Sequence, residues 1–67
     1  MTPFDVREKL GLSQREMAQA MGVHPMTWSK WERGERRPDN AAMRLMELLC
    51  WLRDKRGPTL AQWLKDI

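Results

Sequence analysis

Residues 10–38 read LGLSQREMAQAMGVHPMTWSKWERGERRP, and this stretch decides the fold. Ser13 and Glu16 form a capping-box pattern, in which each side chain can accept a hydrogen bond from the other residue's backbone N–H. The pattern and the apolar spacing that follows predict a helix that begins after Ser13 and ends near Met21. Gly22 follows at the position where a glycine can end a helix in the left-handed conformation without a steric penalty from Cβ.

A second short helix is predicted directly after this turn. Pro25 suits the first position of a helix, which makes His24 its cap, although histidine caps less well than serine. Trp28 and Trp31 then lie on one face until Gly34 ends the helix. Because each indole can bury roughly 200 Å2, we expect both in the core. The alternative is that they are stacking platforms for single-stranded bases.

Three further helices flank this stretch. Thr2 followed by Pro3 marks the start of the first, Asp39 caps a long fourth helix, and Thr59 with Gln62 would form a capping box for a fifth. The expected apolar faces of these helices are made of Phe4, Val6 and Leu10, of Ala41, Leu45, Leu48, Leu49 and Leu52, and of Leu60, Trp63, Leu64 and Ile67. No segment alternates apolar and polar residues for long enough to predict a strand.

Length and composition narrow the possibilities further. A chain of 67 residues has room for one domain, so we expect a single all-α domain over residues 1–67. Cys50 is the one cysteine and His24 the one histidine, which excludes an internal disulfide and leaves too few ligands for a structural zinc. No apolar run approaches the roughly 20 residues of a membrane span, and no segment has the core of a signal peptide. We expect a cytoplasmic protein without a cofactor.

The charge of the chain is modest but concentrated. The formal net charge is +3 with a pI near 9.6, and Lys30, Arg33, Arg36 and Arg37 fall close together after the two tryptophans. A cluster of this kind is either a solvated helix end or a surface for an anionic partner such as nucleic acid. The segments around it decide between the two.

These segments resemble the helix-turn-helix of phage repressor and Cro proteins, the Xre-like regulators. The resemblance lies in LSQREMAQAMGV, HPMTWSKWERG and RRP, and it covers the chain from Phe4 to about Leu52. In that family a small residue, here Ala18, lets the third helix cross close to the second, and Gly22 takes the sharp turn between them. Trp28 is larger than the aliphatic residue that is usual at its position. The resemblance implies a five-helix repressor-like DNA-binding domain with the helix-turn-helix at the second and third helices.

The resemblance also implies that the N-terminal part of the third helix enters the major groove of DNA. The candidate base contacts carried over from the family are Pro25, Met26, Thr27, Ser29 and Lys30. Lys30 can donate to guanine O6 and N7, whereas Met26 and the methyl group of Thr27 can contact a thymine methyl. Met26 stands where the family often has a polar base-reading residue. Two simpler interpretations stay open: Met26 in the core, and Ser29 facing solvent.

Contacts to the DNA backbone are implied for a second set of residues. These are Gln14, His24, Arg33, Arg36 and Arg37. Such contacts fix the register of a protein on the duplex and do not read its sequence. For His24, a role as helix cap and a role in phosphate contact both stay open. The family pattern further implies a largely buried ion pair between Arg7 and Glu32.

The fourth helix carries apolar residues outside its leucine stripe. Met43, Met46 and Cys50 form a second stripe at helical spacing, and Trp51 lies further round the helix. A tryptophan at that position needs cover, either from the fifth helix or from a second subunit. We therefore place a dimer interface on the surface of the fourth and fifth helices, at Met43, Cys50 and Trp51.

Together these features predict a small transcriptional regulator that binds double-stranded DNA sequence-specifically, in the form of a homodimeric repressor on an inverted repeat. One alternative is the antitoxin of a toxin–antitoxin pair, which binds a toxin protein and represses its own operon. Another is a helical adaptor that binds proteins without touching DNA. The sequence offers no constellation of acid, base, nucleophile or metal ligands, so an enzyme is not expected.

Overall fold

The computed structural model describes residues 1–66, and these residues form helices and turns but no strand. In chain order the helices are α1 (Pro3–Leu10), α2 (Gln14–Met21), α3 (Pro25–Glu32), α4 (Asn40–Arg56) and α5 (Thr59–Asp66). The expectation of an all-α chain with five helices is confirmed. No helix in this part of the chain is long and apolar enough to cross a membrane.

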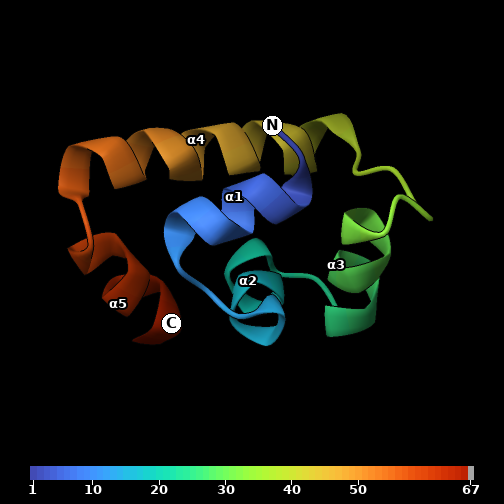
Figure 1. Cartoon of the computed structure of the whole chain (residues 1–67), viewed down its shortest axis with the longest axis horizontal. Coiled ribbons are helices and arrows are strands. Elements are labelled where there is room, and N and C mark those ends of the chain that lie inside the picture. The colour runs from blue at the N-terminus through green and yellow to red at the C-terminus, as the bar shows by residue number, and fades with distance from the viewer. Residues whose placement is uncertain (67) are drawn as a thin grey trace.

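The arrangement of the helices leaves one side of α3 uncovered. Figure 1 shows α4 running along one side of the molecule, with α1 beside it and with α3 and α5 near its opposite ends. The shorter α2 packs against both α3 and α5, while α1 packs mainly against α4. α3 lies at one end of the molecule (Figure 1), and residues on the side opposite its two buried tryptophans, such as Met26, are exposed.

Four helices begin at the caps that the sequence indicates, namely Thr2, Ser13, His24 and Asp39. At the start of α2, the Glu16 N–H donates to Ser13 Oγ at 3.1 Å and the Ser13 N–H donates to Glu16 Oε1 at 2.9 Å. The end of α2 also follows expectation, since Gly22 adopts the left-handed conformation at φ 71°. The turn between α2 and α3 is therefore set by local sequence.

The start of α5 differs from expectation. Thr59 is the first residue of the helix, and its hydroxyl donates to the Arg56 carbonyl at 2.9 Å. The Gln62 amide donates to Asp66 at 3.1 Å, so the expected capping box is wrong. The reason is that the Gly57 carbonyl already accepts a bond from the first turn of α5, which places Thr59 inside that turn.

The core is built around the two tryptophans of α3. Trp28 is fully buried, and its ring meets that of Trp31 edge to face, with centroids 5.6 Å apart and planes at 67°. Ala18 of α2 is also fully buried, which is consistent with the close crossing of α2 and α3. The other buried apolar residues are Val6, Leu10, Leu12, Met17, Met21, Met46, Leu49, Cys50, Leu60 and Leu64. The assignment of both tryptophans to the core is confirmed, and stacking on single-stranded bases is excluded for side chains so enclosed.

The buried face of α4 lies further round the helix than the leucine stripe suggests. Met46, Leu49 and Cys50 are buried, whereas Leu48 and Ala41 are exposed. Apolar residues occur on several sides of this helix, so its orientation depends on α1, the helix against which it packs most. Cys50, expected at the dimer interface, is buried in the core of the single chain, and burial raises the pKa of its thiol.

Two other apolar residues also lie outside the core. Phe4 is exposed, with the Arg7 guanidinium 5.3 Å from its ring centroid. Trp63 is exposed on α5, where Leu60 and Leu64 turn inward. Phe4 and Trp63 were expected on the apolar faces of their helices, and neither is buried in the core. The same expectation for Ile67 lies outside the described residues.

Candidate nucleic-acid interface

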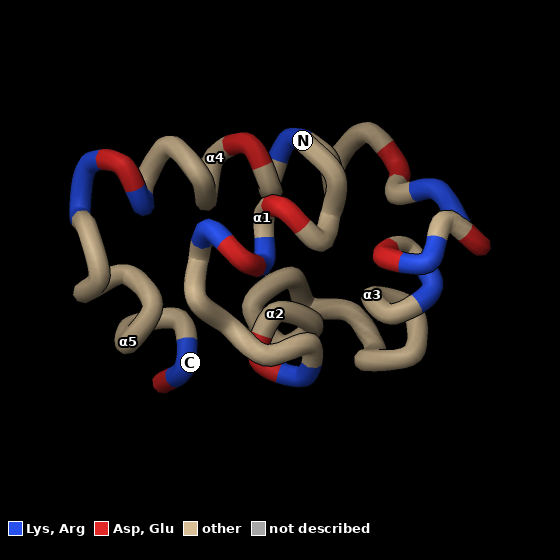
Figure 2. Tube along the Cα trace, in the orientation of Figure 1, with Lys and Arg blue, Asp and Glu red and all other residues tan. Residues whose placement is uncertain are grey.

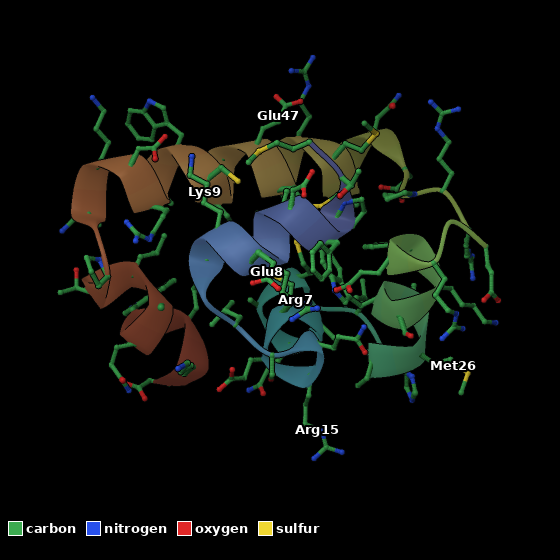
Figure 3. The ribbon with its side chains drawn as sticks, in the orientation of Figure 1. Arg7, Glu8, Lys9, Arg15, Met26 and Glu47 are labelled. Atoms are coloured by element: carbon green, nitrogen blue, oxygen red, sulfur yellow. The ribbon has the colours of Figure 1, made fainter. Side chains whose placement is uncertain are left out.

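The outer side of α3 carries the residues expected to contact bases. Trp28 and Trp31 occupy the inner side, and Met26 on the outer side is 60% exposed. In Figure 3 the Met26 side chain points away from the body of the protein. The interpretation of Met26 as a core residue is therefore wrong. The side chains at the free side of α3 are those of Pro25 and Met26, which are exposed, and of Thr27, Ser29 and Lys30, which are partly exposed.

His24 serves as the cap of α3. Its Nδ1 atom accepts a hydrogen bond from the Met26 backbone N–H at 3.0 Å. In the neutral ring this assigns the N–H to Nε2, which can donate to an anion. The side chain is exposed at the N-terminal end of α3. Capping and a phosphate contact are therefore compatible for this residue.

One carboxylate connects three helices beneath this surface. Glu32 of α3 accepts from Arg7 of α1 twice, with Nε at 2.5 Å from Oε2 and Nη2 at 3.1 Å from Oε1. Gln14 of α2 donates its amide N–H to Glu32 Oε1 at 3.1 Å, and the Trp28 indole donates to Oε2. Arg7 also donates to the Leu12 carbonyl at 3.1 Å. The ion pair expected between Arg7 and Glu32 is present, and it fixes α3 relative to both preceding helices.

The pair is charged at neutral pH although little of it is exposed. The side chains of Arg7 and Glu32 are 16% and 7% exposed. Burial by itself raises the pKa of Glu32, but the hydrogen bonds from Arg7, Gln14 and Trp28 together bring it below its usual range. The hydrogen bond to Glu32 raises the pKa of Arg7. A bidentate bond between two ions is the strongest pairing these side chains can make.

Positive charge gathers where α3 leads into the loop before α4. Figure 2 shows lysine and arginine positions clustered at the end of α3 and along this loop. Arg33, Arg36 and Arg37 are all exposed there. Arg33 is bonded to its neighbours, since it donates to Ser29 Oγ at 2.7 Å and forms an ion pair with Glu35. No carboxylate within residues 1–66 lies at ion-pairing distance from Arg36 or Arg37.

The start of α2 brings further polar groups to this end of the molecule. Gln14 is exposed and touches α3 through Glu32, so the structure places it beside the expected base-contacting helix. Arg15 was not among the expected site residues, yet it is exposed in the first turn of α2 and points away from the protein (Figure 3). A basic residue beside the capping box is a weak sequence signal, because arginine is common on any solvated helix surface.

The outer surface of α4 carries apolar residues that the monomer leaves open. Trp51 is 56% exposed, and α5 does not cover it; the ammonium group of Lys55 lies 5.5 Å from its ring centroid. Met43 is also exposed and lines a shallow groove together with Trp51. Leu48, three residues before Trp51, is exposed as well. We refer to Met43, Leu48 and Trp51 as the α4 surface. Within the described residues no group of three or more side chains could hold a metal ion.

Comparison with known proteins agrees with this geometry. The helix-turn-helix family model matches residues 5–49, which include most of α1, all of α2 and α3, and the first part of α4. No curated protein and no solved structure matches the chain. The matched range contains the turn at Gly22, the outer side of α3 and the arginines that follow. The chain therefore belongs to the Xre-like helix-turn-helix family of DNA-binding transcriptional regulators.

Proposed function

We propose that the protein is a cytoplasmic transcriptional repressor that binds an inverted-repeat operator as a homodimer. One observation carries this proposal: α3 is fixed from within by two buried tryptophans and by the bonds of Glu32, while its opposite side is exposed. A helix that enters the major groove must be held rigidly and must present side chains to base edges. The exposed arginines beside α3 supply the charge that such a helix needs near phosphates.

The outer side of α3 supports a mixed readout of bases. Lys30 donates to guanine O6 or N7, and Ser29 bonds to an adjacent polar edge. Met26 and the Thr27 methyl group pack against a thymine methyl, and Pro25 contacts the same groove from the first turn of α3. Because Met26 is apolar and exposed at the start of the helix, we expect the preferred operator to contain thymine where this side chain meets the groove.

The contacts that position the protein come from around α3. Gln14, at the start of α2, donates to one phosphate, and the Nε2–H of His24 donates to a phosphate near the start of α3. Arg36 and Arg37 contact phosphates from the loop that follows, since neither shares its charge with a carboxylate within residues 1–66. These contacts contribute affinity to any duplex and determine where α3 sits.

The homodimer is supported by the α4 surface. A single module of this size buries limited area on DNA, and two modules on half-sites about one helical turn apart bind far more tightly. Exposed apolar side chains grouped on one helix are typical of a surface that another protein covers. We assign this cover to a second copy of the chain, with Met43, Leu48 and Trp51 in the interface.

A charge at the centre of the α4 surface tests the dimer. Trp51→Glu should lower the sedimentation coefficient at concentrations where the wild type is dimeric, and it should reduce the protein bound to an inverted repeat from two chains to one. Trp63→Glu is the matched control, because this tryptophan is equally exposed but lies on α5 outside the α4 surface. If wild type and Trp51→Glu have the same mass in solution and the same stoichiometry on DNA, the proposed interface is wrong.

Repression itself is tested with a reporter gene. An operator placed over a promoter should lower expression when the protein is present, whereas an activator would raise it. An antitoxin would repress in the same way but would also bind a toxin, and a neighbouring toxin gene would favour that alternative. The adaptor alternative predicts no effect on the reporter at all.

A further inference from the structure

Arg33 lies on the same side of α3 as the residues proposed to read bases. It follows Met26 by seven residues, Ser29 by four and Lys30 by three, which are the spacings of one helix face. The helical backbone reaches this position, since Arg33 has helical dihedral angles and its N–H donates to the Ser29 carbonyl at 3.1 Å. A side chain on a helix leans toward the N-terminus. The guanidinium therefore lies between Ser29 on the outer side of α3 and Glu35 in the loop that follows.

Two bonds hold the guanidinium in this place. Its Nη1 donates to Ser29 Oγ at 2.7 Å, and its Nε donates to a carboxylate oxygen of Glu35. A guanidinium has five N–H donors, so one hydrogen of Nη1 and both of Nη2 stay available. An edge with one N–H on each of these nitrogens matches guanine O6 and N7. Because Ser29 accepts from Arg33, its own hydroxyl hydrogen is free to donate to a neighbouring acceptor.

Glu35 is fixed by the backbone and not only by its side chain. Gly34 adopts the left-handed conformation at φ 75°, and the Glu35 N–H donates to the Lys30 carbonyl at 2.9 Å. This is the bond that closes a helix after a left-handed glycine. The carboxylate is consequently held next to Arg33 by the end of α3 itself, and the hydrogen bond from Arg33 lowers the pKa of Glu35, so that it stays ionised.

A carboxylate at this position makes Arg33 a poor ligand for phosphate. The Glu35 carboxylate offsets the positive charge of the guanidinium, so that the pair as a whole is neutral, and it places a negative charge near the DNA backbone. Base reading has the opposite requirement, because it depends on the direction of the N–H groups more than on net charge. The side chains of Arg33 and Glu35 are 52% and 54% exposed, so the pair contributes little to folding stability.

We propose that Arg33 reads a guanine in the major groove, with Ser29 and Glu35 as the residues that orient its guanidinium. The proposal rests on the proposed binding of duplex DNA by α3. It changes the expectation from sequence, which placed Arg33 with Arg36 and Arg37 among the phosphate contacts. Arg33 and Lys30 then lie side by side as the two cationic readers of the operator.

Selection of binding sites from a random duplex pool tests this assignment. Arg33→Ala should lose the preference for guanine at one base pair, and the ratio of affinities for selected and random duplexes should fall by about tenfold. Arg37→Ala is the matched control, since it should weaken both duplexes by the same factor and enrich the wild-type motif. If Arg33→Ala also enriches the wild-type motif and weakens both duplexes equally, Arg33 is a phosphate contact and the proposal is overturned.

Two variants of Glu35 test the orienting role. Glu35→Gln removes the charge but keeps an oxygen that accepts from Arg33 Nε, so random duplexes should bind more tightly while the guanine preference is retained. Glu35→Ala should also bind random duplexes more tightly but should lose part of the preference. Equal preferences in both variants would overturn the orienting role of Glu35. If the wild type enriches no motif, the proposed function fails, and the proposal that Arg33 reads a guanine fails with it. If Arg33→Ala still enriches the wild-type motif, only the proposal about Arg33 fails and the proposed function stands.

Discussion

Glu32→Ala is expected to lower the free energy of unfolding by roughly 3–5 kcal/mol even without DNA, because it removes one partner of an enclosed ion pair. The guanidinium of Arg7 is then left 16% exposed without its carboxylate. Gln14 and the Trp28 indole lose their acceptor at the same time. A chain of 67 residues has a total stability of roughly 3–10 kcal/mol. At room temperature this variant should therefore be largely unfolded or close to its unfolding transition.

Thermal or urea unfolding of the free protein measures this loss. Glu47→Ala is the control, because Glu47 pairs with Arg44 at 3.4 Å on the open surface of α4 and its loss should leave the transition nearly unchanged.

The difference in stability between wild type and Glu32→Ala should also depend on pH. Since the folded pKa of Glu32 lies below its ordinary value of 4.5, the stabilisation is complete above that pH and is lost as the pH falls through the folded pKa. Equal stability of wild type and Glu32→Ala at neutral pH would contradict the role of this pair.

Trp28→Ala is expected to cost roughly 3–5 kcal/mol, the usual loss for a large aromatic side chain removed from a core. The Trp28 side chain is fully buried, packs edge to face on Trp31 and donates its indole N–H to Glu32. Its removal therefore leaves a cavity directly beneath α3, and the Glu32 carboxylate loses one of its hydrogen-bond donors. DNA binding should fall together with folding, because α3 loses the residue that holds it in place.

Unfolding in urea separates this effect from the general loss of a tryptophan. Trp63→Ala removes the same atoms from a side chain that is mostly exposed, and it should cost less than about 1 kcal/mol. If both variants lose the same stability, Trp28 does not have the central place in the core that its burial indicates.

The helix starts were predictable where one residue and its near neighbours determine them. Ser13 with Glu16, and Asp39 before α4, satisfy N–H groups only three residues away, so the sequence alone contains the interaction. Thr59 has the same signature, but the first turn of α5 already begins with a hydrogen bond to the Gly57 carbonyl. The threonine hydroxyl instead donates to the Arg56 carbonyl. A capping pattern is thus reliable only when no residue before it can begin the helix.

The orientation of α4 and the arrangement around α3 were less predictable. Leu48 and Cys50 are both apolar, and only packing against other helices decides that Cys50 is buried and Leu48 exposed. The family pattern did imply that Glu32 pairs with Arg7, because both positions belong to the motif. The pairing of Arg33 with Glu35 has no such signal, since it depends on where a long flexible side chain lies at the end of a helix.

The most direct test of the account is site selection with duplex DNA, followed by salt titrations of wild type, Lys30→Ala and Arg37→Ala. The wild type should enrich an inverted repeat. Arg37→Ala should weaken binding to all duplexes alike and reduce the slope of log affinity against log salt by about one. Lys30→Ala should cost roughly 1–3 kcal/mol on the preferred operator and much less on random DNA, with relaxed choice at one base pair. If the wild type enriches no motif and neither substitution changes binding, α3 is not a recognition helix and the account is contradicted.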